Sequence, residues 1–410
     1  MVVAILLATL WPLPEQAYRA SLSPVACLVC GDQGVQDVIQ NIIMLLPLGL
    51  ALGLAGVRPG WAALGAFGLA VLVESLQYTV VTGRDASLSD VITNTAGAAL
   101  GAALAPHFPT LMRPGRRAAA RLALAAVLVW AGAWAFGAWA LEGNPGAGHW
   151  RGRFPGDLPD APALSGDAVQ ASIGGIPLGL APVSLPLEVE QGFARDSFTL
   201  RVVVRPGPPI AWRENVVTII DFRDDGGDAN NSLVMMLNRV RHRALLSFRI
   251  NAARARLRTP SFNLGPAFDV PSGREVTLEV ARARGILRAA ADRDGQALAT
   301  DYRIGPELLW AVMAPRTPQP GLLWRIEAFL WAAVLLAVIA YWAARSRDTG
   351  VLVAVSSLAI LAQLITPRLF AVAEQSLLGW AILLGGLTLG ALVGRRSFPA
   401  DDSRVTTHDP

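Results

Sequence analysis

The stretch from Asp37 to Gly101 decides the fold, because it holds three apolar segments that each carry polar residues. It reads DVIQNIIMLLPLGL over residues 37–50, ESLQ over residues 74–77 and SDVITNTAGAALG over residues 89–101. Each segment is about long enough to cross a bilayer, for which about 20 apolar residues suffice. An ionisable group that faces hydrocarbon costs several kcal/mol. We therefore expect the polar residues to face one another, or a wet space between helices.

The spacing of these residues supports that expectation. Three pairs have helical spacing: Asp37 with Asn41, Glu74 with Gln77, and Asp90 with Asn94. Residues three or four apart lie on one face of a helix, so each pair points in one direction. Gly97 and Gly101 form a small-xxx-small pattern, which predicts close packing against another helix.

Four pieces of this stretch follow one another in a fixed order. They are Asn41-x5-Pro47-Leu48-Gly49, Glu74-x-x-Gln77, Gly83-Arg84 and Asp90-x-x-x-Asn94-x-x-Gly97-x-x-x-Gly101. The set resembles the VanZ-like membrane protein family over roughly residues 1–105. That family is named for a protein associated with resistance to teicoplanin, a glycopeptide antibiotic that binds cell-wall precursors. The resemblance implies a bacterial cell-envelope membrane protein, without an established reaction.

Composition agrees with an integral membrane protein that has a soluble part. The 410 residues are 53% hydrophobic and only 16% charged, against about 25% charged in soluble domains. The sequence has no block of basic residues that would indicate nucleic-acid binding. The four histidines are scattered, and the sequence predicts neither a metal site nor a cofactor. Cys27 and Cys30 lie in a short loop, which favours a structural disulfide or two free thiols over redox catalysis.

Apolar runs and arginines predict the topology. Residues 1–13 read as a first helix, and further spans are expected at about 38–57, 61–82, 88–106, 119–141, 323–344, 350–367 and 374–394. Arginines gather at 113–121, 345–347 and 395–396, which the positive-inside rule places in the cytoplasm. About eight spans with both termini inside then leave the region between residues 141 and 323 outside the inner membrane.

That outer region changes to an alternating pattern. Strands are expected at 197–204, 215–222, 232–237, 245–250, 275–280 and 286–290, with an Asp294-Gly295 turn. Such spacing predicts an antiparallel sandwich. The order of Phe198-Thr-Leu, Asp221-Phe222 and Asp294-Gly295 is similar to the LamG or concanavalin-like jelly roll, which implies a fold that often binds glycans.

The predicted domains are therefore a VanZ-like transmembrane domain (1–141), a linker (142–164), an extracytoplasmic β-sandwich (165–312), C-terminal transmembrane helices (323–396) and a polar tail (397–410). The fold class is an α-helical polytopic membrane protein with an inserted all-β sandwich.

Seven residues are candidates for ligand binding: Asp37, Asn41, Gln77, Arg84, Asp90 and Asn94, which fall near the predicted outer leaflet, and Glu74, which lies deeper. Glu74 lies about 12 Å below the expected end of its helix, at 1.5 Å per residue. It is a candidate base, proton carrier or ligand for a cation. The alternative is a structural ion pair with Arg84. Arg84 suits a phosphate, but a snorkelling or capping arginine would look the same. Asp90 suits helix capping. Ser87 is a weak candidate nucleophile, because no base lies near it in sequence.

In the sandwich, Asp221, Asp224, Asp225 and Asp228 allow either a calcium site or a solvated turn, and the missing closing glutamate favours the turn. Arg239, Arg241 and Arg243 alternate, as do Arg254, Arg256 and Arg258. On strands each trio would share one face, which reads as a solvated face or a patch for acidic glycan.

The leading hypothesis is a protein that binds or modulates an amphiphile at the outer leaflet. A lipid-linked cell-wall precursor or a glycopeptide-type molecule fits the family resemblance, and membrane lipid is the expected surrounding partner. Two alternatives stay open from sequence: a membrane enzyme that acts on a lipid-linked head group, with Glu74 as base and Arg84 on phosphate, and a transporter.

Overall fold

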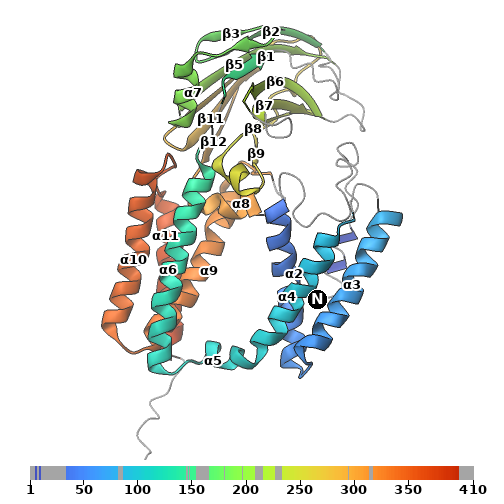
Figure 1. Ribbon diagram of the computed structural model, residues 1–410. Helices are drawn as coiled ribbons and strands as arrows, with labels where there is room; N and C mark the ends of the chain where they lie inside the picture. Colours follow the sequence, from blue (N-terminus) through green and yellow to red (C-terminus); the bar gives the residue numbers. More distant parts are fainter. Residues whose placement is uncertain are drawn as a thin grey trace, which may run out of the picture.

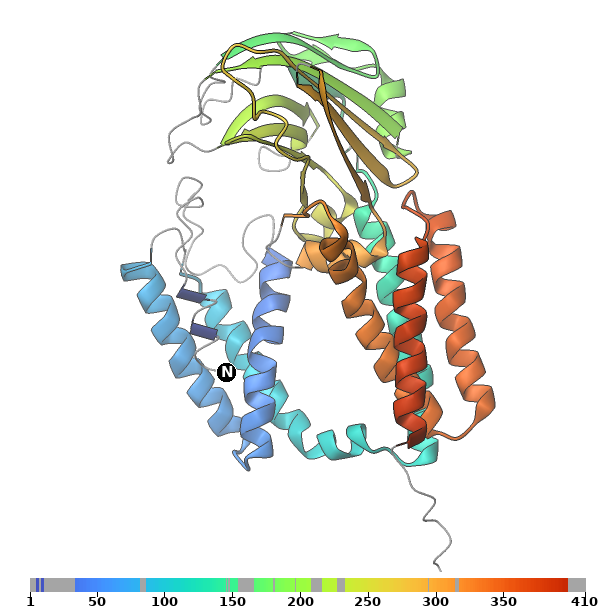
Figure 2. The same ribbon diagram turned by 180° about the vertical axis from the view of Figure 1, so that it is seen from behind.

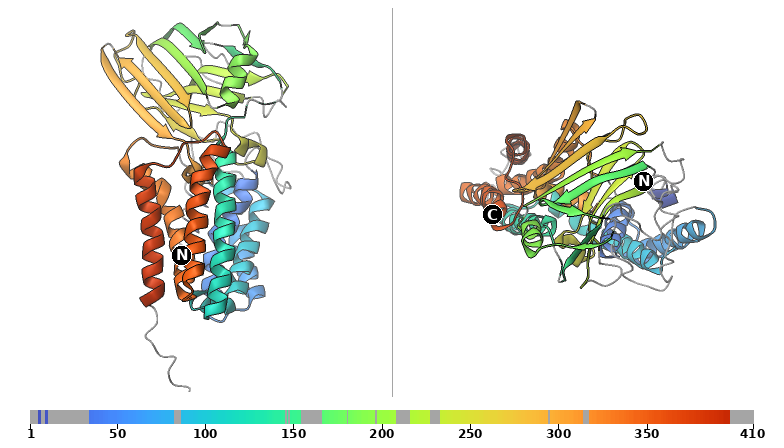
Figure 3. Two further views of the ribbon diagram at one scale, coloured as in Figure 1. Left: turned by 90° about the vertical axis from the view of Figure 1, so that its left-hand side faces the viewer. Right: turned by 90° about the horizontal axis from the view of Figure 1, so that it is seen from above.

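The computed structural model joins a helical part to a β-sandwich that lies on one end of the helices (Figures 1 and 3). It describes residues 5–6, 9–10, 34–81, 86–144, 146, 148–153, 166–179, 181–195, 197–207, 216–226, 233–293, 295–313 and 317–396. The predicted cysteine loop, Arg84, Asp228, Asp294 and the polar tail lie outside these residues.

Six of the described helices are long and apolar enough to cross a membrane. They are α2 (Gly34–Leu54), α3 (Pro59–Thr79), α6 (Arg116–Leu141), α9 (Leu322–Arg345), α10 (Thr349–Leu369) and α11 (Leu377–Arg396). The chain is therefore a multi-pass membrane protein, while the expected count of about eight spans is not confirmed. The expected span at 88–106 is a 17-residue helix, α4 (Leu88–Leu104), because the chain turns into a 3-10 helix, η2 (Ala105–His107), at Pro106.

The first helical bundle consists of α2, α3 and α4, with α4 packed against both of the others. Glycines bring α2 and α4 into backbone contact. A Cβ atom added at Gly101 would lie 2.1 Å from the carbonyl oxygen of Leu46, and one at Gly49 would lie 1.9 Å from that of Ala98. The close packing predicted from Gly97 and Gly101 is thus confirmed.

The second bundle consists of α6, α9, α10 and α11. Its helices α9 and α11 are also in backbone contact at a glycine, since a Cβ atom at Gly390 would lie 2.0 Å from the carbonyl oxygen of Ala337. Trp134 is fully buried at the α6–α9 contact, with ring centroids 5.1 Å from Trp130 and 6.2 Å from Trp331. The α4–α6 connection, η2 and α5 (Phe108–Met112), runs between the two bundles at the end remote from the sandwich (Figure 2).

Exposed apolar side chains mark the membrane-facing surface. In the described residues of the sandwich only Val169 and Leu187 are large, apolar and exposed. On the helices many large apolar side chains are exposed. Examples are Trp61, Val129 and Leu389, which are 66%, 73% and 60% exposed. A soluble surface rarely shows so much contiguous apolar area, so these faces fit contact with lipid.

The sandwich has two six-stranded antiparallel sheets. One sheet has the order β4-β1-β6-β7-β8-β9 and comprises Val183–Ser184, Trp150–Arg153, Val216–Asp224, Leu233–Val240, Arg243–Phe248 and Ser261–Asn263. The other has the order β12-β11-β10-β5-β2-β3 and comprises Gln296–Arg303, Ile286–Arg293, Val276–Ala283, Ser197–Pro206, Gly166–Ile173 and Ile176–Leu178. All six predicted strands are present, and the antiparallel β-domain is confirmed; a jelly roll is not.

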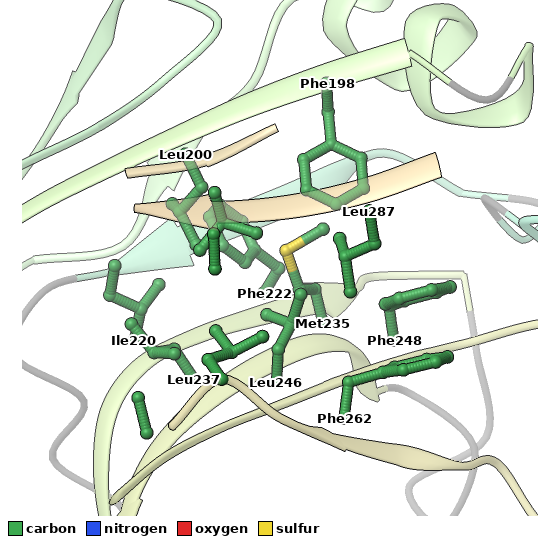
Figure 4. Close-up of a cluster of buried hydrophobic side chains, with 14 of the residues drawn as sticks. Phe198, Leu200, Ile220, Phe222, Met235, Leu237, Leu246, Phe248, Phe262 and Leu287 are labelled. Carbon is green, nitrogen blue, oxygen red and sulfur yellow. The ribbon is translucent and has the colours of Figure 1, made fainter. Parts of the chain in front are cut away.

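Alternating side chains from both sheets form the sandwich core (Figure 4). Leu200 of β5 and Phe222 of β6 are fully buried there, and Phe248 stacks on Phe262 with centroids 5.5 Å apart. The same core continues into the helices, because it includes Leu141 of α6 and Ala328 of α9. The sandwich is therefore seated on the second bundle by apolar packing.

The expected linker at 142–164 is wrong for its described part. Trp150–Arg153 forms β1, which pairs with β6 and β4. Trp150 is fully buried, with its ring centroid 4.8 Å from that of Phe193 on α7 (Leu187–Ala194). The local glycines and prolines suggested a linker, but burial of the Trp150 side chain in the core holds this segment in the sheet, since an aromatic side chain contributes a large buried area.

Candidate functional site

Polar side chains of α2, α3 and α4 gather at the helix ends that face the sandwich, here called the sandwich end. The opposite end carries Arg58 before α3, Arg116 at the start of α6, and Arg345 and Arg396 at the ends of α9 and α11. We call that the basic end. Figure 1 shows that the two ends lie on opposite sides of the helical part.

Asn41 and Asp90 join α2 to α4. The Asn41 Nδ2 donates a hydrogen bond to the Asp90 Oδ1 at 2.8 Å. Asp90 lies in the first turn of α4, where a carboxylate complements the helix dipole. The N-cap itself is Ser87, whose side chain accepts from the backbone N–H of Ser89 at 3.1 Å. The capping role expected for Asp90 thus belongs to Ser87, and the nucleophile hypothesis for Ser87 loses support.

Glu74 joins α3 to the start of α4. It is buried, and its Oε2 accepts a hydrogen bond from the backbone N–H of Ser87 at 2.7 Å. The helix ends at Thr79 rather than at residue 82, because the chain leaves helical geometry at Val80. Glu74 therefore lies about 7.5 Å below the helix end at 1.5 Å per residue, shallower than expected.

Gln77, one turn after Glu74, ties α3 to the N-terminal segment. It is buried, and its Nε2 donates to the carbonyl oxygen of Thr9 at 2.9 Å. This bond fits the network role expected for Gln77.

Asn94 has a buried acceptor atom without a hydrogen bond from any residue that the structure describes. It is 6% exposed, and its Oδ1 has no hydrogen-bond partner in the part of the chain that the structure describes. A buried acceptor left unpaired costs about 1–3 kcal/mol. Such groups are rare in native proteins, where buried polar atoms are nearly always hydrogen-bonded.

The remaining two candidates, Asp37 and Arg84, are not part of this hydrogen-bonded group among the described residues. Asp37 is exposed in the first turn of α2, so burial does not bring it into the cluster. Arg84 lies outside the described residues, and its proposed pairing with Glu74 or a phosphate stays a prediction.

Two residues that sequence reasoning missed connect α2 to the sandwich. Gln36 is buried; its Oε1 accepts from the backbone N–H of Arg258 at 2.8 Å, and its Nε2 donates to Met313. Gln40 also donates to the Met313 carbonyl oxygen. Gln36 and Gln40 are four residues apart on the helix that carries Asn41, and this spacing could have indicated that both side chains lie on one face of α2. The cluster is thus mechanically joined to the β-domain.

In the acidic run of the sandwich, Asp225 is exposed in a turn and Asp228 lies outside the described residues, whereas Asp221 and Asp224 are buried in β6. Asp221 is buried between Arg153 and Arg223, each with its Nε 2.9 Å from a carboxylate oxygen. Asp224 is buried beside Arg249, at 2.8 Å. Both carboxylates are therefore paired rather than solvated. Across the described residues, no three His, Cys, Asp or Glu side chains are grouped to hold a metal ion.

Asp224 shows how this pairing acts on a carboxylate. Burial alone would raise its pKa, but hydrogen bonds from Arg249 and from the backbone N–H groups of Gly226 and Gly148 lower the pKa overall. The charged form is thus the one that the fold stabilises.

The arginine trios do not share faces as expected. Arg239 is 2% exposed on β7, while Arg241 has a positive φ of 55° in the β7–β8 turn. Arg254 lies in a 3-10 helix, η3 (Asn251–Ala255), and Arg256 follows it with a φ of 51°. Period-two spacing has no meaning across a turn or a helix, so neither trio forms a strand-borne patch.

Glu307 is a further buried acid, between the sandwich and the second bundle in η4 (Pro306–Leu308). Its side chain is 4% exposed, and its Oε2 has no hydrogen-bond partner among the described residues. Burial raises its pKa to about 7. No local sequence pattern marks this group, because its element η4 packs against α6 and α9, which are distant in sequence.

Comparison with known proteins agrees with the residues of the first bundle. A family model described as VanZ/LLP1 matches residues 3–111, which include α2, α3, α4 and the cluster that they carry. The N-terminal region is therefore VanZ-like, as expected. The match does not reach the sandwich or the second bundle. No curated protein and no solved structure matched the chain.

Proposed function

We propose that this VanZ-like membrane protein binds the polar head of an amphiphile at the sandwich end of its first bundle. The observation that carries the proposal is the buried Oδ1 of Asn94, which has no hydrogen-bond partner among the described residues and lies one helical turn after Asp90 on α4. A ligand that donates a hydrogen bond to this oxygen removes the cost of the unpaired acceptor. A hydrogen bond from a ligand to this atom would therefore add to the binding free energy.

The chemistry of the cluster indicates the class of head group. Glu74, Asp90 and the Asn94 Oδ1 are acceptors, and ionised carboxylates accept but do not donate. They suit a head group rich in hydroxyl, amide or ammonium donors. Sugar and peptide groups have these donors, and both occur in lipid-linked cell-wall precursors and in glycopeptide molecules. Arg84 stays a predicted contact for phosphate.

Orientation follows from the arginines. The basic end is cytoplasmic by the positive-inside rule, so the sandwich is extracytoplasmic and the cluster lies at the outer leaflet of a bacterial inner membrane. Reporter fusions at Gly273, in an open turn of the sandwich, and at Arg117 test this orientation. A cytoplasmic signal at Gly273 overturns it.

The sandwich would contribute a second contact, to the glycan part of the same ligand. Gln36 and Gln40 support this role, because they hold the sandwich next to the helix that carries Asn41. A domain held at a fixed distance from the cluster raises the effective concentration of any second binding contact.

Binding is favoured over catalysis by one observation. The Glu74 Oε2 already accepts a hydrogen bond from the backbone N–H of Ser87, so this carboxylate has a structural task in joining α3 to the start of α4. Release of product from a labelled lipid-linked precursor would favour the enzyme instead, and uptake into vesicles would favour a transporter.

The experiment is a binding screen with the purified full-length protein in nanodiscs. Its probes are a lipid-linked disaccharide-peptide precursor, teicoplanin and phosphatidylcholine. Glu74→Gln keeps the acceptor for the Ser87 N–H but removes the charge, so we expect it to fold and to bind at least tenfold more weakly. Glu374→Gln, which makes the same change at an exposed site between α10 and α11, is the matched control. Equal binding by both variants contradicts the proposal.

A further inference from the structure

The α4–α6 connection forms a basic hollow at the end of the helices remote from the sandwich. Its volume is about 730 Å³, within the range of small-molecule sites. It is lined by His107, Thr110, Leu111, Arg117, Ala118, Arg121 and Leu122. None of these is acidic, and the described part of the chain offers Arg117 and Arg121 no ion pair.

One wall of the hollow is the first two turns of α6. Arg117 and Arg121 are four residues apart, as are Ala118 and Leu122, so a basic stripe runs beside an apolar one. The N-cap of α6 is Gly115, which provides no side-chain cap. The first N–H groups of a 26-residue helix therefore add their positive potential to the two arginines.

The other wall is α5, which α9 holds in place. Trp342 donates from its Nε1 to the Leu111 carbonyl oxygen at 2.9 Å, and Tyr341 donates to that of Met112 at 2.5 Å. Arg345, which is buried, donates from its Nε to the Pro114 carbonyl oxygen at 3.0 Å. These three bonds fix the connection between the bundles, so the hollow is a built feature rather than the side of a loose loop.

We propose that this hollow binds the head group of an anionic phospholipid. Both arginines are exposed in the first two turns of α6, a candidate membrane span, so their charge would meet the phosphate level of a bilayer. Leu111 and Leu122 give the hollow an apolar part that suits the start of an acyl chain. A basic pocket of this kind at helix ends recognises anionic lipid head groups.

A lipid rather than a soluble phosphate is the occupant, because the hollow combines charge with apolar lining at membrane depth. The site is distinct from the polar cluster: it lies at the opposite end of the helices and attracts the opposite charge. The lipid-site proposal is therefore independent of the ligand proposed above for the polar cluster.

The test uses the full chain in detergent micelles and counts bound lipid by native mass spectrometry. Phosphatidylglycerol should bind more tightly than phosphatidylcholine. Each arginine near a charged membrane surface contributes about 1 kcal/mol, and 1.4 kcal/mol is tenfold, so Arg117→Gln with Arg121→Gln should weaken phosphatidylglycerol binding about 30-fold. The control is Arg58→Gln with Arg396→Gln, which removes the same charge at the same end but outside the hollow.

Ala118→Trp is a second variant that fills the hollow without changing the charge, and it should also weaken binding. Equal losses in the test and control pairs would show unspecific surface attraction and overturn the proposal. Displacement of the lipid by glycerol phosphate at the same concentration would overturn it in favour of a soluble phosphate site. Equal binding of the two lipids would overturn it as well.

Discussion

The backbone contact between α2 and α4 predicts a large effect from one methyl group. In Gly101→Ala the added carbon would lie 2.1 Å from the carbonyl oxygen of Leu46 and 2.7 Å from the backbone nitrogen of Leu50. Ordinary contact begins at 3.4 Å, so the helices would have to separate by about 1.3 Å. Overpacking of this kind typically costs about 1–3 kcal/mol, and separation also weakens the neighbouring contact at Gly49.

The matched control is Gly65→Ala in α3, where an added Cβ has nothing within 4 Å. There the change only removes a glycine from a helix interior, which gains up to about 1 kcal/mol in water. The two variants should therefore move stability in opposite directions. Unfolding of the purified protein by increasing SDS in mixed micelles, followed by helical circular dichroism, measures both. If Gly101→Ala were as stable as Gly65→Ala, the backbone contact would be refuted.

Further predictions concern the sandwich and its attachment. Asp224→Asn should destabilise the protein by roughly 3–5 kcal/mol, because it leaves the buried Arg249 without its counter-charge, and thermal unfolding in detergent would measure the loss; a change under about 1 kcal/mol would contradict it. The pKa of Glu307 is raised from 4.5 to about 7, so the folded state holds a proton that the unfolded state releases. Stability should then fall as pH rises from about 4.5 to 7, by up to roughly 3 kcal/mol, and Glu307→Gln should flatten that slope in the same melts. Gln36→Ala should increase hydrogen exchange at the Arg258 N–H, which donates to the Gln36 Oε1, without changing exchange in β5, and no change at Arg258 would contradict the docking contact.

The sequence predicted the elements that have a strong period of their own. The strands β5 and β10 largely alternate apolar and polar residues, and the glycines of α4 have the spacing of a packing seam. Prediction failed where a residue's place is set by distant parts of the chain. Trp150 joins a core built mostly from residues 170–304, and no local pattern in a glycine-rich stretch reports that. Arg241 and Arg256 lie at positive φ, where a pattern that assumes strands does not apply.

In the candidate site, too, the sequence predicted features that depend on local patterns and missed those that depend on distant parts of the chain. Asn41, Asp90, Glu74 and Gln77 were predicted because a polar residue in an apolar helix is costly unless it has a partner or a ligand. The burial of Asn94 without a partner could not be predicted, since it depends on how three helices meet. The docking bonds of Gln36 depend on a segment more than two hundred residues away.

The most direct test of the proposed function is the paired measurement of stability and binding in Asn94→Leu. Leucine has a similar size and no polar atom, so it removes the unpaired acceptor. If Asn94 serves a ligand, the variant should be as stable as the wild type or more stable by about 1–3 kcal/mol, and it should bind the lipid-linked precursor or teicoplanin at least tenfold more weakly. A variant that loses stability while its remaining folded fraction binds normally would contradict the binding role, because Asn94 would then hold the bundle together and take no part in binding.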